Sequence, residues 1–483
     1  MTINHIRLRC GILAVCMVLG ACSKDPQVSA ETPLPEASPR NLLLICIDTV
    51  RADVFYGLGE AHKDSLSAWQ DDALVFEQAI SSSSWTVPAL GSVFSGLWQS
   101  GHGGGRLPDV NIGGLMLSTA LNEGVPLLAE AAEQEGFDTA ALSASPWTNS
   151  PDDAMGLTRG FKEKQKLGRL GSRAAFGQMN EILAQKPEDT PFFYYLHFME
   201  AHDWHVTAEP VLDARIAKFS PEERALFLQV APPQACKDEQ SLLCKRYLVY
   251  ASAVKRLRES IAVMLTRMEE KSLLEDTVVV VFSDHGEEFG DHANDKRIQK
   301  TVGSSPKKFV GHGQSMYQEL LHVPIIVWHP KYDGAGIDEL VSLVDIGPTV
   351  ARWLDIEFLP AQWPGYYLDN YLQPSQKALE RVAYASGIAN GEQQISAQQG
   401  TKKSIWYMVS DENSYFDLAS DPYESHSAPS DNLVLRFDGL FLDYARSMQN
   451  KERKPALLPD EQIRRLQSIG YLQGVETSAD TEN

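Results

Sequence analysis

NLLLICIDTVRAD, residues 41–53, combines a strand signal with a cluster of charged side chains. Its first seven residues form an almost unbroken apolar run. Such a run is typical of a strand that is buried on both faces, as in a parallel sheet between two helical layers. Asp48 follows the run directly. Because ligands bind outside the carboxyl ends of the strands in such sheets, Asp48 is the first candidate site residue.

Similar apolar runs recur along the chain, at Thr139–Leu142, Phe192–Phe198, Thr277–Phe282 and Val323–Trp328. Helical patterns fall between them, notably at Leu127–Gln134 and Tyr247–Lys271. Strands that alternate with helices predict a doubly wound α/β domain of buried parallel strands over residues 41–375.

The chain becomes more polar after residue 375. Short strand-like pieces stand at Ser404–Met408 and Tyr415–Leu418, and an amphipathic helical pattern over Ile463–Ile469 ends at Gly470. We therefore predict a smaller C-terminal α+β subdomain at residues 376–483.

The composition is that of a large, strongly acidic globular protein. Its 483 residues are 43% hydrophobic and 22% charged, which suits one large core with a smaller companion. The formal net charge of −21 argues against nucleic acid as a partner. An anionic substrate would then need a local metal ion or basic cluster.

The N-terminal segment has the features of an export signal. Arg7 and Arg9 precede the apolar stretch Cys10–Gly20, which is too short to span a bilayer. The sequence Leu19–Cys22 resembles a bacterial lipoprotein cleavage box, with Cys22 as the lipidated residue. The alternative is an ordinary signal peptide and a chance cysteine.

These features predict a lipid-anchored protein of the bacterial cell envelope. The signal peptide would comprise residues 1–21, and a tether containing Pro and Ser would comprise residues 22–40. Ser23 after the cysteine resembles the sorting pattern for the outer membrane, facing the periplasm or the exterior.

Two cysteines outside the signal lie close together in a polar segment. Cys236 and Cys244 are expected to form a disulfide in an oxidising envelope. The alternative is a metal-binding pair, but no further Cys or His lies nearby in the sequence.

Acidic residues follow two of the predicted strands. Asp48 follows the first, and Thr277–Phe282 leads through Ser283 into Asp284 and His285. Buried carboxylates are costly unless they are paired or bind a cation. The pattern predicts a divalent metal at these strand ends. The alternative is that Asp48 caps a turn and pairs with Arg51.

A hydroxyl stands at the start of a predicted helix in SWTVPALGSVFSG, residues 84–96. Thr86 lies just before Pro88, which favours a first helical turn, and Gly96 closes the helix. The positive end of a helix dipole is a good place to hold a phosphate or sulfate. The alternative is that Thr86 is only a helix cap.

With these motifs the chain resembles the sulfatases and their phosphoester relatives in the alkaline-phosphatase superfamily, over nearly all of residues 41–472. The matching elements are Asp48–Asp53, Thr86–Gly96, Phe198–His202, Ser283–Glu287, Gly311–Gly313, Val344–Thr349, Tyr415–Leu418 and Ser468–Leu472. The resemblance implies a mixed central sheet flanked by helices, with a small C-terminal sheet subdomain.

The chain departs from true sulfatases at the nucleophile. The resemblance places Thr86 where sulfatases carry the Cys or Ser that becomes formylglycine, and Leu90 where they carry a supporting Arg. A Gly-Lys-x-His sulfate clamp is also missing, and Asn149 could supply an amide donor instead unless it only shapes a turn. Thr at this position resembles phosphodiesterase and phosphoethanolamine-transferase relatives.

These observations predict a metal-dependent ester hydrolase that acts through a covalent Thr86 intermediate. Asp48, Asp284, His285 and the Thr86 oxygen would hold the cation, and calcium, magnesium, manganese or zinc suits such ligands. The resemblance implies that His202 and His312 are the remaining site residues, which would clamp the substrate, protonate the leaving group or bind a second metal.

The predicted substrate is an anionic ester of sulfate or phosphate, and a sulfated or phosphorylated glycan is one such substrate. The alternatives are a transferase of phospho-headgroups onto envelope glycans and an inactive scaffold that binds anionic glycans. Two segments are candidate lids or binding loops: the basic stretch between Gly286 and His312, and the insertion Val206–Lys245. His292 in the first segment is a weaker site candidate.

Overall fold

The computed structural model describes residues 38–106, 118–149, 153–168, 171–204, 208–297, 310–358, 360, 363–373, 380–427 and 464. These residues lie in one compact unit, Thr32–Asn483. The predicted signal peptide, Cys22, the tether up to residue 37 and all but Arg464 of the predicted final helix lie outside the described residues. Their assignments, and the domain boundary at residue 375, stay predictions.

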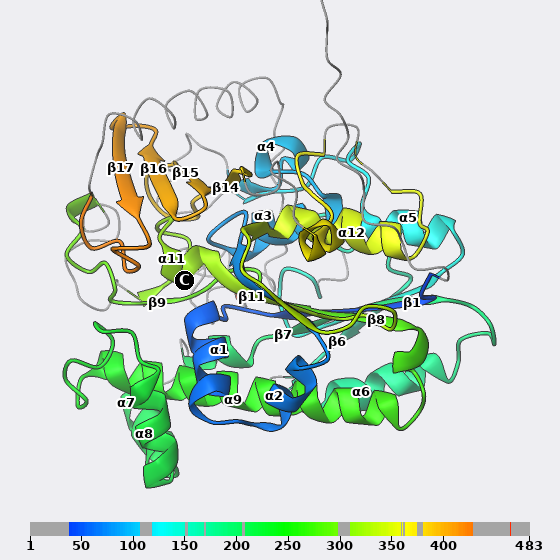
Figure 1. Cartoon of the computed structure of the whole chain (residues 1–483), viewed down its shortest axis with the longest axis horizontal. Coiled ribbons are helices and arrows are strands. Elements are labelled where there is room, and N and C mark those ends of the chain that lie inside the picture. Colours follow the sequence, from blue (N-terminus) through cyan, green and yellow to red (C-terminus); the bar gives the residue numbers. More distant parts are fainter. Residues whose placement is uncertain are drawn as a thin grey trace, which may run out of the picture. The chain divides into compact units, whose positions relative to one another are not determined.

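A mixed nine-stranded sheet forms the centre of the molecule (Figure 1), as the resemblance implied. Strand β1 (Asn41–Ile47) lies between β7 (Phe192–Phe198) and β8 (Thr277–Phe282) and is parallel to both. Strands β5 (Asp138–Ser143) and β6 (Glu163–Lys166) continue the parallel part. Four of the predicted strands, β1, β5, β7 and β8, therefore bring their carboxyl ends to one edge of the sheet.

The expectation that all the apolar runs form parallel strands is wrong for Val323–Trp328. Strand β11 (His322–Trp328) is antiparallel to β8 and to β2 (Leu74–Ile80). An unbroken apolar run indicates burial on both faces, which any central strand requires, but it does not encode the direction of the strand. The sequence analysis also missed β2, because its exposed Glu77 and Gln78 interrupt the apolar pattern.

Helices cover both faces of the sheet (Figure 1). One face carries α3 (Thr86–Ser95), α5 (Leu128–Gln134) and α12 (Ile346–Trp353). The other carries α1 (Ala52–Ala61), α2 (Ser65–Gln70), α6 (Gly171–Leu183) and α9 (Leu242–Glu269).

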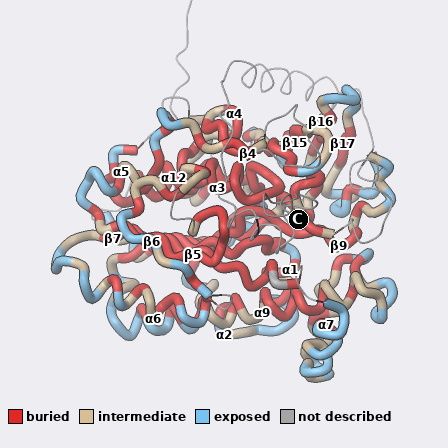
Figure 2. Tube along the Cα trace, turned by 180° about the vertical axis from the view of Figure 1, so that it is seen from behind, coloured by how far each residue is buried: buried red, intermediate tan, exposed pale blue. Residues whose placement is uncertain are grey.

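Strand β1 shows why its apolar run is unbroken. Its alternate residues pack into two separate cores: Leu42 and Leu44 face one helical layer, and Leu43 and Ile45 face the other. Each of these side chains is at most 1% exposed, and burial stabilises each by about 1.5–3 kcal/mol. Figure 2 shows the resulting buried interior.

The C-terminal part contains an antiparallel sheet of β14 (Ala383–Ser386), β15 (Gln394–Gln399), β16 (Lys402–Tyr407) and β17 (Glu412–Asp417). Shorter elements complete the described chain: α4 (Gln99–His102), β3 (Gly105–Arg106), β4 (Ser118–Thr119), β9 (Glu288–Phe289), β10 (Val310–Gly311), α11 (Gln318–Leu321), β12 (Ala335–Ile337) and β13 (Val341–Ser342), together with single 3-10 turns.

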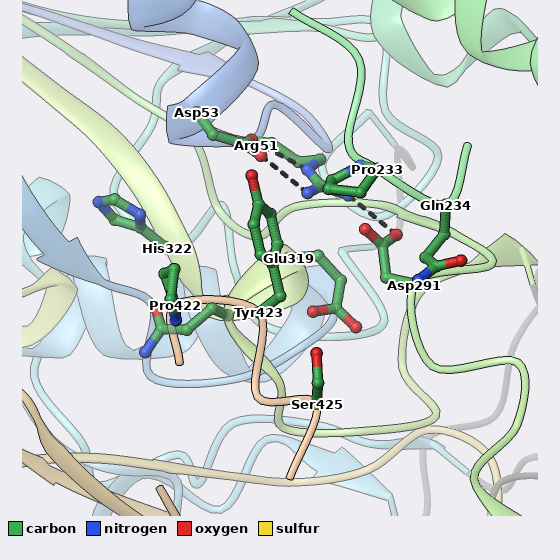
Figure 3. A pocket seen from close by; sticks show the side chains of 11 residues that line it. Arg51, Asp53, Pro233, Gln234, Asp291, Glu319, His322, Pro422, Tyr423 and Ser425 are labelled. Carbon is green, nitrogen blue, oxygen red and sulfur yellow. Dashed lines mark hydrogen bonds and ion pairs between the residues drawn. The ribbon is translucent and has the colours of Figure 1, made fainter. Parts of the chain in front are cut away.

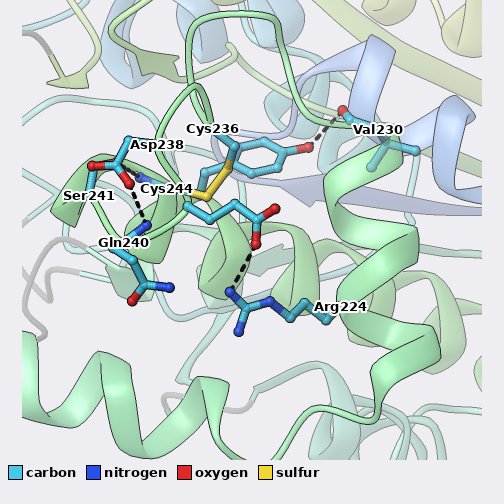
Figure 4. The surroundings of a disulfide bond; sticks show 9 residues. Arg224, Val230, Cys236, Asp238, Gln240, Ser241 and Cys244 are labelled. Carbon is cyan, nitrogen blue, oxygen red and sulfur yellow. Dashed lines mark hydrogen bonds and ion pairs between the residues drawn. A yellow bond between two sulfur atoms is a disulfide. The ribbon is translucent and has the colours of Figure 1, made fainter.

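The insertion before α9 contains α7 (Glu209–Ile216) and α8 (Pro221–Gln229). Cys236 and Cys244 form a disulfide there, which ties the loop after α8 to the first turn of α9 (Figure 4). Among the described residues, no helix combines the length and the apolar character needed to cross a bilayer.

Candidate metal centre

The carboxyl ends of β1 and β8 bring three of the predicted ligands together. Ligand atoms of Asp48, Asp284 and His285 all lie within 4.8 Å of one another. The His285 Nε2 atom is 3.4 Å from Asp284 Oδ2 and 3.9 Å from Asp48 Oδ1. All three side chains are fully buried. Two residues 236 positions apart therefore meet because their strands are parallel neighbours.

The predicted nucleophile joins this group from the other side. Thr86 is the first residue of α3, and its Oγ1 is 3.2 Å from His285 Nε2. The preceding Trp85 donates its indole N–H to the Gly387 carbonyl at 2.7 Å, which fixes the start of the helix. Gly96 ends the helix in the left-handed region, at φ 68°, as the sequence predicted.

The backbone beside Asp48 is strained. Thr49 has a φ of 61°, which is rare for a β-branched residue and costs about 1–3 kcal/mol. Its carbonyl accepts a hydrogen bond from the Tyr250 hydroxyl at 2.9 Å, and its N–H points to Asp284 Oδ1 at 3.4 Å. The His285 N–H also donates to Asp284 Oδ1, at 3.0 Å. The strained turn thus holds one oxygen of Asp284 and leaves the other free for a ligand.

Neither carboxylate pairs with a Lys or Arg in the part of the chain that the structure describes. Asp48 Oδ1 and Asp284 Oδ2 are buried without a hydrogen-bond donor in the described chain. Burial raises the pKa of Asp48 to about 7, with Glu287 adding to the rise and His285 opposing it. Burial and the charge of Asp48 raise the pKa of Asp284 to about 6. A divalent cation would remove this penalty, and two carboxylates with one imidazole suit it.

Arg51 does not neutralise Asp48, contrary to the alternative prediction. Its guanidinium pairs with Asp53 at 2.8 Å and with Asp291 at 3.1 Å, and it donates to the Glu287 carbonyl at 3.2 Å. These pairs line a separate cavity of about 270 Å³ (Figure 3). The positive charge of Arg51 is therefore balanced by Asp53 and Asp291 in the wall of that cavity.

Two further predicted histidines lie beside the centre. The His312 ring is 4.4 Å from the His285 ring and 5.2 Å from the His202 ring, centre to centre. His312 Nδ1 is 3.0 Å from Glu287 Oε1, and Glu287 Oε2 accepts the Trp204 indole N–H at 3.2 Å. Thr86 and the five other predicted site residues therefore form one continuous group of polar side chains. The five are Asp48, His202, Asp284, His285 and His312.

Two residues of this group, Glu287 and His197, had no role predicted from the sequence. Glu287 was part of a quoted motif, yet only the structure shows that it holds His312. His197 lies within the apolar run Phe192–Phe198. A polar side chain in a strand that is buried on both faces requires a polar partner, and this requirement is the signal that could have identified it. Its Nε2 is 2.8 Å from Asp48 Oδ2, and burial lowers its pKa to about 4.

The other candidates have contacts outside the group around Asp48 and Asp284. Asn149 donates its side-chain amide to the Ser143 carbonyl at 3.1 Å. His292 pairs with Glu319 at 2.7 Å and stacks on Tyr317. Of the basic stretch, Arg297 pairs with Asp295 at 3.2 Å, whereas Lys300, Lys307 and Lys308 lie outside the described residues.

Comparisons with known proteins agree with this arrangement. A family model described as Sulfatase matches residues 40–356. An ulvan-active sulfatase of Formosa agariphila is 26% identical over 252 residues, which are 50% of this chain and 45% of that protein. The chain therefore matches less than half of that relative's length.

Solved structures share the fold. A phosphonate monoester hydrolase of Agrobacterium radiobacter superposes with a TM-score of 0.61 at 17% identity, over 87% of this chain and 100% of the other. A protein solved in complex with its substrate D-glucosamine-2-N,6-O-disulfate gives a TM-score of 0.61 at 13% identity, over 90% and 100% of the two chains.

Proposed function

The chain belongs to the sulfatase family, and from that membership we propose that it is a metal-dependent hydrolase of sulfate or phosphate esters with Thr86 as its nucleophile. One observation carries the proposal. The Thr86 hydroxyl converges with His285 and with two buried carboxylate oxygens that accept no hydrogen bond from the described residues. A scaffold that had lost its activity would have no need to keep this costly arrangement.

The contacts of His285 define which of its nitrogens can bind a cation. His285 Nδ1 is 2.9 Å from the Gly286 carbonyl, which can only accept, so Nδ1 carries the hydrogen. His285 Nε2 therefore offers its only lone pair on the side of Thr86 and the two carboxylates, where it would be a ligand of the cation. A divalent cation held by Asp48, Asp284 and His285 would supply charge stabilisation for the alkoxide and for the ester oxygens.

The reaction we propose has two steps. The Thr86 hydroxyl first releases its proton to solvent, which contact with a cation would favour. Its Oγ1 then forms a bond to phosphorus or sulfur as the bond to the leaving oxygen breaks in line, and His202 or His312 protonates that oxygen. Water then attacks the threonyl ester at phosphorus or sulfur and releases the Thr86 hydroxyl and an inorganic or monoester anion. Threonine cannot become formylglycine, so the second step requires this water.

The substrate we propose is an anionic ester on a glycan. The names of relatives support this class, since one acts on ulvan and another is bound to a disulfated glucosamine. The lipid anchor at Cys22 would hold the enzyme in the cell envelope, where such polymers are met. Acylated Cys22 in the mature protein, found by mass spectrometry of the membrane fraction, would test the anchor.

A substrate panel with matched variants tests the activity. Metal-loaded protein is assayed against aryl sulfate, aryl phosphate, a phosphodiester and a phosphonate monoester. Thr86→Ala should abolish turnover, Thr86→Ser should retain part of it, and Thr139→Ala should be unchanged. Thr139 on β5 is a suitable control because it is also a buried threonine, and its hydroxyl donates a hydrogen bond to the Gly160 carbonyl. Full activity in Thr86→Ala, or a covalent adduct at another residue, would refute the nucleophile.

A further inference from the structure

A fully buried histidine stands behind the metal centre. His197 lies on β7, in register with Cys46 of β1, and Asp48 follows two residues later. Its Nε2 atom is 2.8 Å from Asp48 Oδ2. The other oxygen, Asp48 Oδ1, has no hydrogen-bond donor in the described chain and lies on the side of His285.

The contacts of the ring define its tautomer. The Asp48 carboxylate accepts, so His197 Nε2 carries the hydrogen. His197 Nδ1 must then accept, and the Tyr195 hydroxyl lies 2.8 Å away as the donor. The Thr148 hydroxyl stands beyond it at 3.4 Å and is itself 2.6 Å from Ser143. A buried chain of hydroxyls therefore fixes the orientation of the ring.

The same contacts exclude a second role for His197. Its ring lies near Cys46 and Asp284, with ligand atoms within 4.8 Å of one another, so the three could be taken for another metal site. Both ring nitrogens are already engaged, one by Asp48 and the other by Tyr195. Since a metal-bound imidazole must offer a free lone pair, His197 is not available as a ligand in this arrangement.

We propose that His197 is a positioning residue, which holds Asp48 Oδ2 so that Asp48 offers a single oxygen, Oδ1, to the cation. The inference rests on the proposed metal-dependent function. Without the N–H donor, Oδ2 would be left buried and unbonded, and the carboxylate could rotate away from the geometry that the cation needs. Loss of such an outer partner weakens metal binding by about 10–100-fold.

Metal binding tests the proposal without relying on turnover. The metal-free full chain and its variants are titrated with Zn²⁺ and with Mn²⁺ in a calorimeter. His197→Ala should weaken binding about 10–100-fold. His197→Gln should restore most of it, because the glutamine amide can donate from nearly the position of Nε2. Tyr195→Phe, which removes only the partner of Nδ1, should have a smaller effect.

A control variant separates positioning from general loss of a buried ring. His329 is buried against Trp353 and Tyr332, away from the centre, and His329→Ala should leave the affinity unchanged. Unchanged affinity in His197→Ala would overturn the inference alone, and so would equal losses in the Ala and Gln variants. A wild-type chain that binds neither ion would overturn the proposed metal dependence and this inference together. If His197→Ala does not fold, the comparison of His197→Gln with Tyr195→Phe decides, since the inference requires measurable binding in both.

Discussion

Two clusters of buried acidic residues lie in this molecule, and they differ in what surrounds them. In the metal centre, Asp48 and Asp284 have oxygens without a donor, and neither pairs with a described Lys or Arg. In a second cluster, which we call the charge network, Glu319 pairs with His292 at 2.7 Å and Glu424 with Lys403 at 2.8 Å. The charge network joins α11 to the C-terminal sheet, because Lys403 lies on β16.

The pKa values of Glu319 and Asp48 illustrate the difference, whereas at Glu424 burial outweighs the charge of Lys403 and raises the pKa. Burial pushes the pKa of a carboxyl upward in both clusters. At Glu319 the charges of His292 and Arg51 outweigh burial and lower the pKa. The pKa of His292 is in turn raised to about 10, because the charge of Glu319 outweighs burial. At Asp48 burial prevails and the pKa rises to about 7. A buried acid that brings its own cation is structural, whereas one that lacks a cation indicates a place where a ligand supplies the charge.

The largest expected effect comes from removing a metal ligand. Asp284→Asn should lower kcat/KM by roughly 10²–10³-fold or more, because the proposed cation, which would stabilise the charge that develops in the transition state, would bind more weakly. The same change should not destabilise the metal-free protein, because it relieves repulsion between Asp48 and Asp284. Steady-state kinetics and urea denaturation in chelator measure the two effects. A metal-free variant that is several kcal/mol less stable than wild type would contradict the comparison.

The charge network should respond in the opposite way. Lys403→Met leaves Glu424 buried and unpaired, so the free energy of unfolding should fall by about 3–5 kcal/mol. Lys402→Met is the matched control on the same strand, because Lys402 forms a partly exposed pair with Asp417 whose loss should cost no more than about 1 kcal/mol. Urea denaturation measures both. Equal losses of unfolding free energy in the two variants would show that burial does not determine how much these ion pairs contribute to stability.

The smallest expected effect is a pH dependence of metal stabilisation. The folded pKa values of Asp48 and Asp284, about 7 and about 6, exceed the ordinary value of 3.8. Between about pH 4 and 7 the folded metal-free protein therefore binds more protons than the unfolded chain, and these two groups make its stability fall as pH rises. A cation displaces those protons, so it should raise Tm more at pH 8 than at pH 5. Melting curves with and without metal test this, and an equal or larger shift at pH 5 would contradict it.

The sequence predicted the centre where local patterns sufficed. Asp48 and Asp284 stand directly after or one residue after apolar runs. Thr86 stands two residues before a proline that favours the first turn of a helix. The predicted direction of β11 was wrong, because a hydrophobic pattern does not encode the direction of a strand. The role of His197 depends on the register of β7 against β1, which is set by tertiary packing and cannot be read from either strand alone.

The central claim is that one divalent cation binds at Asp48, Asp284 and His285. Calorimetric titration of the chelator-treated chain with Zn²⁺ and with Mn²⁺ tests it most directly. We expect one tightly bound ion per chain, and loss of that binding in both Asp48→Asn and Asp284→Asn. Binding of equal strength in those variants, or no binding to the wild-type chain, would contradict it.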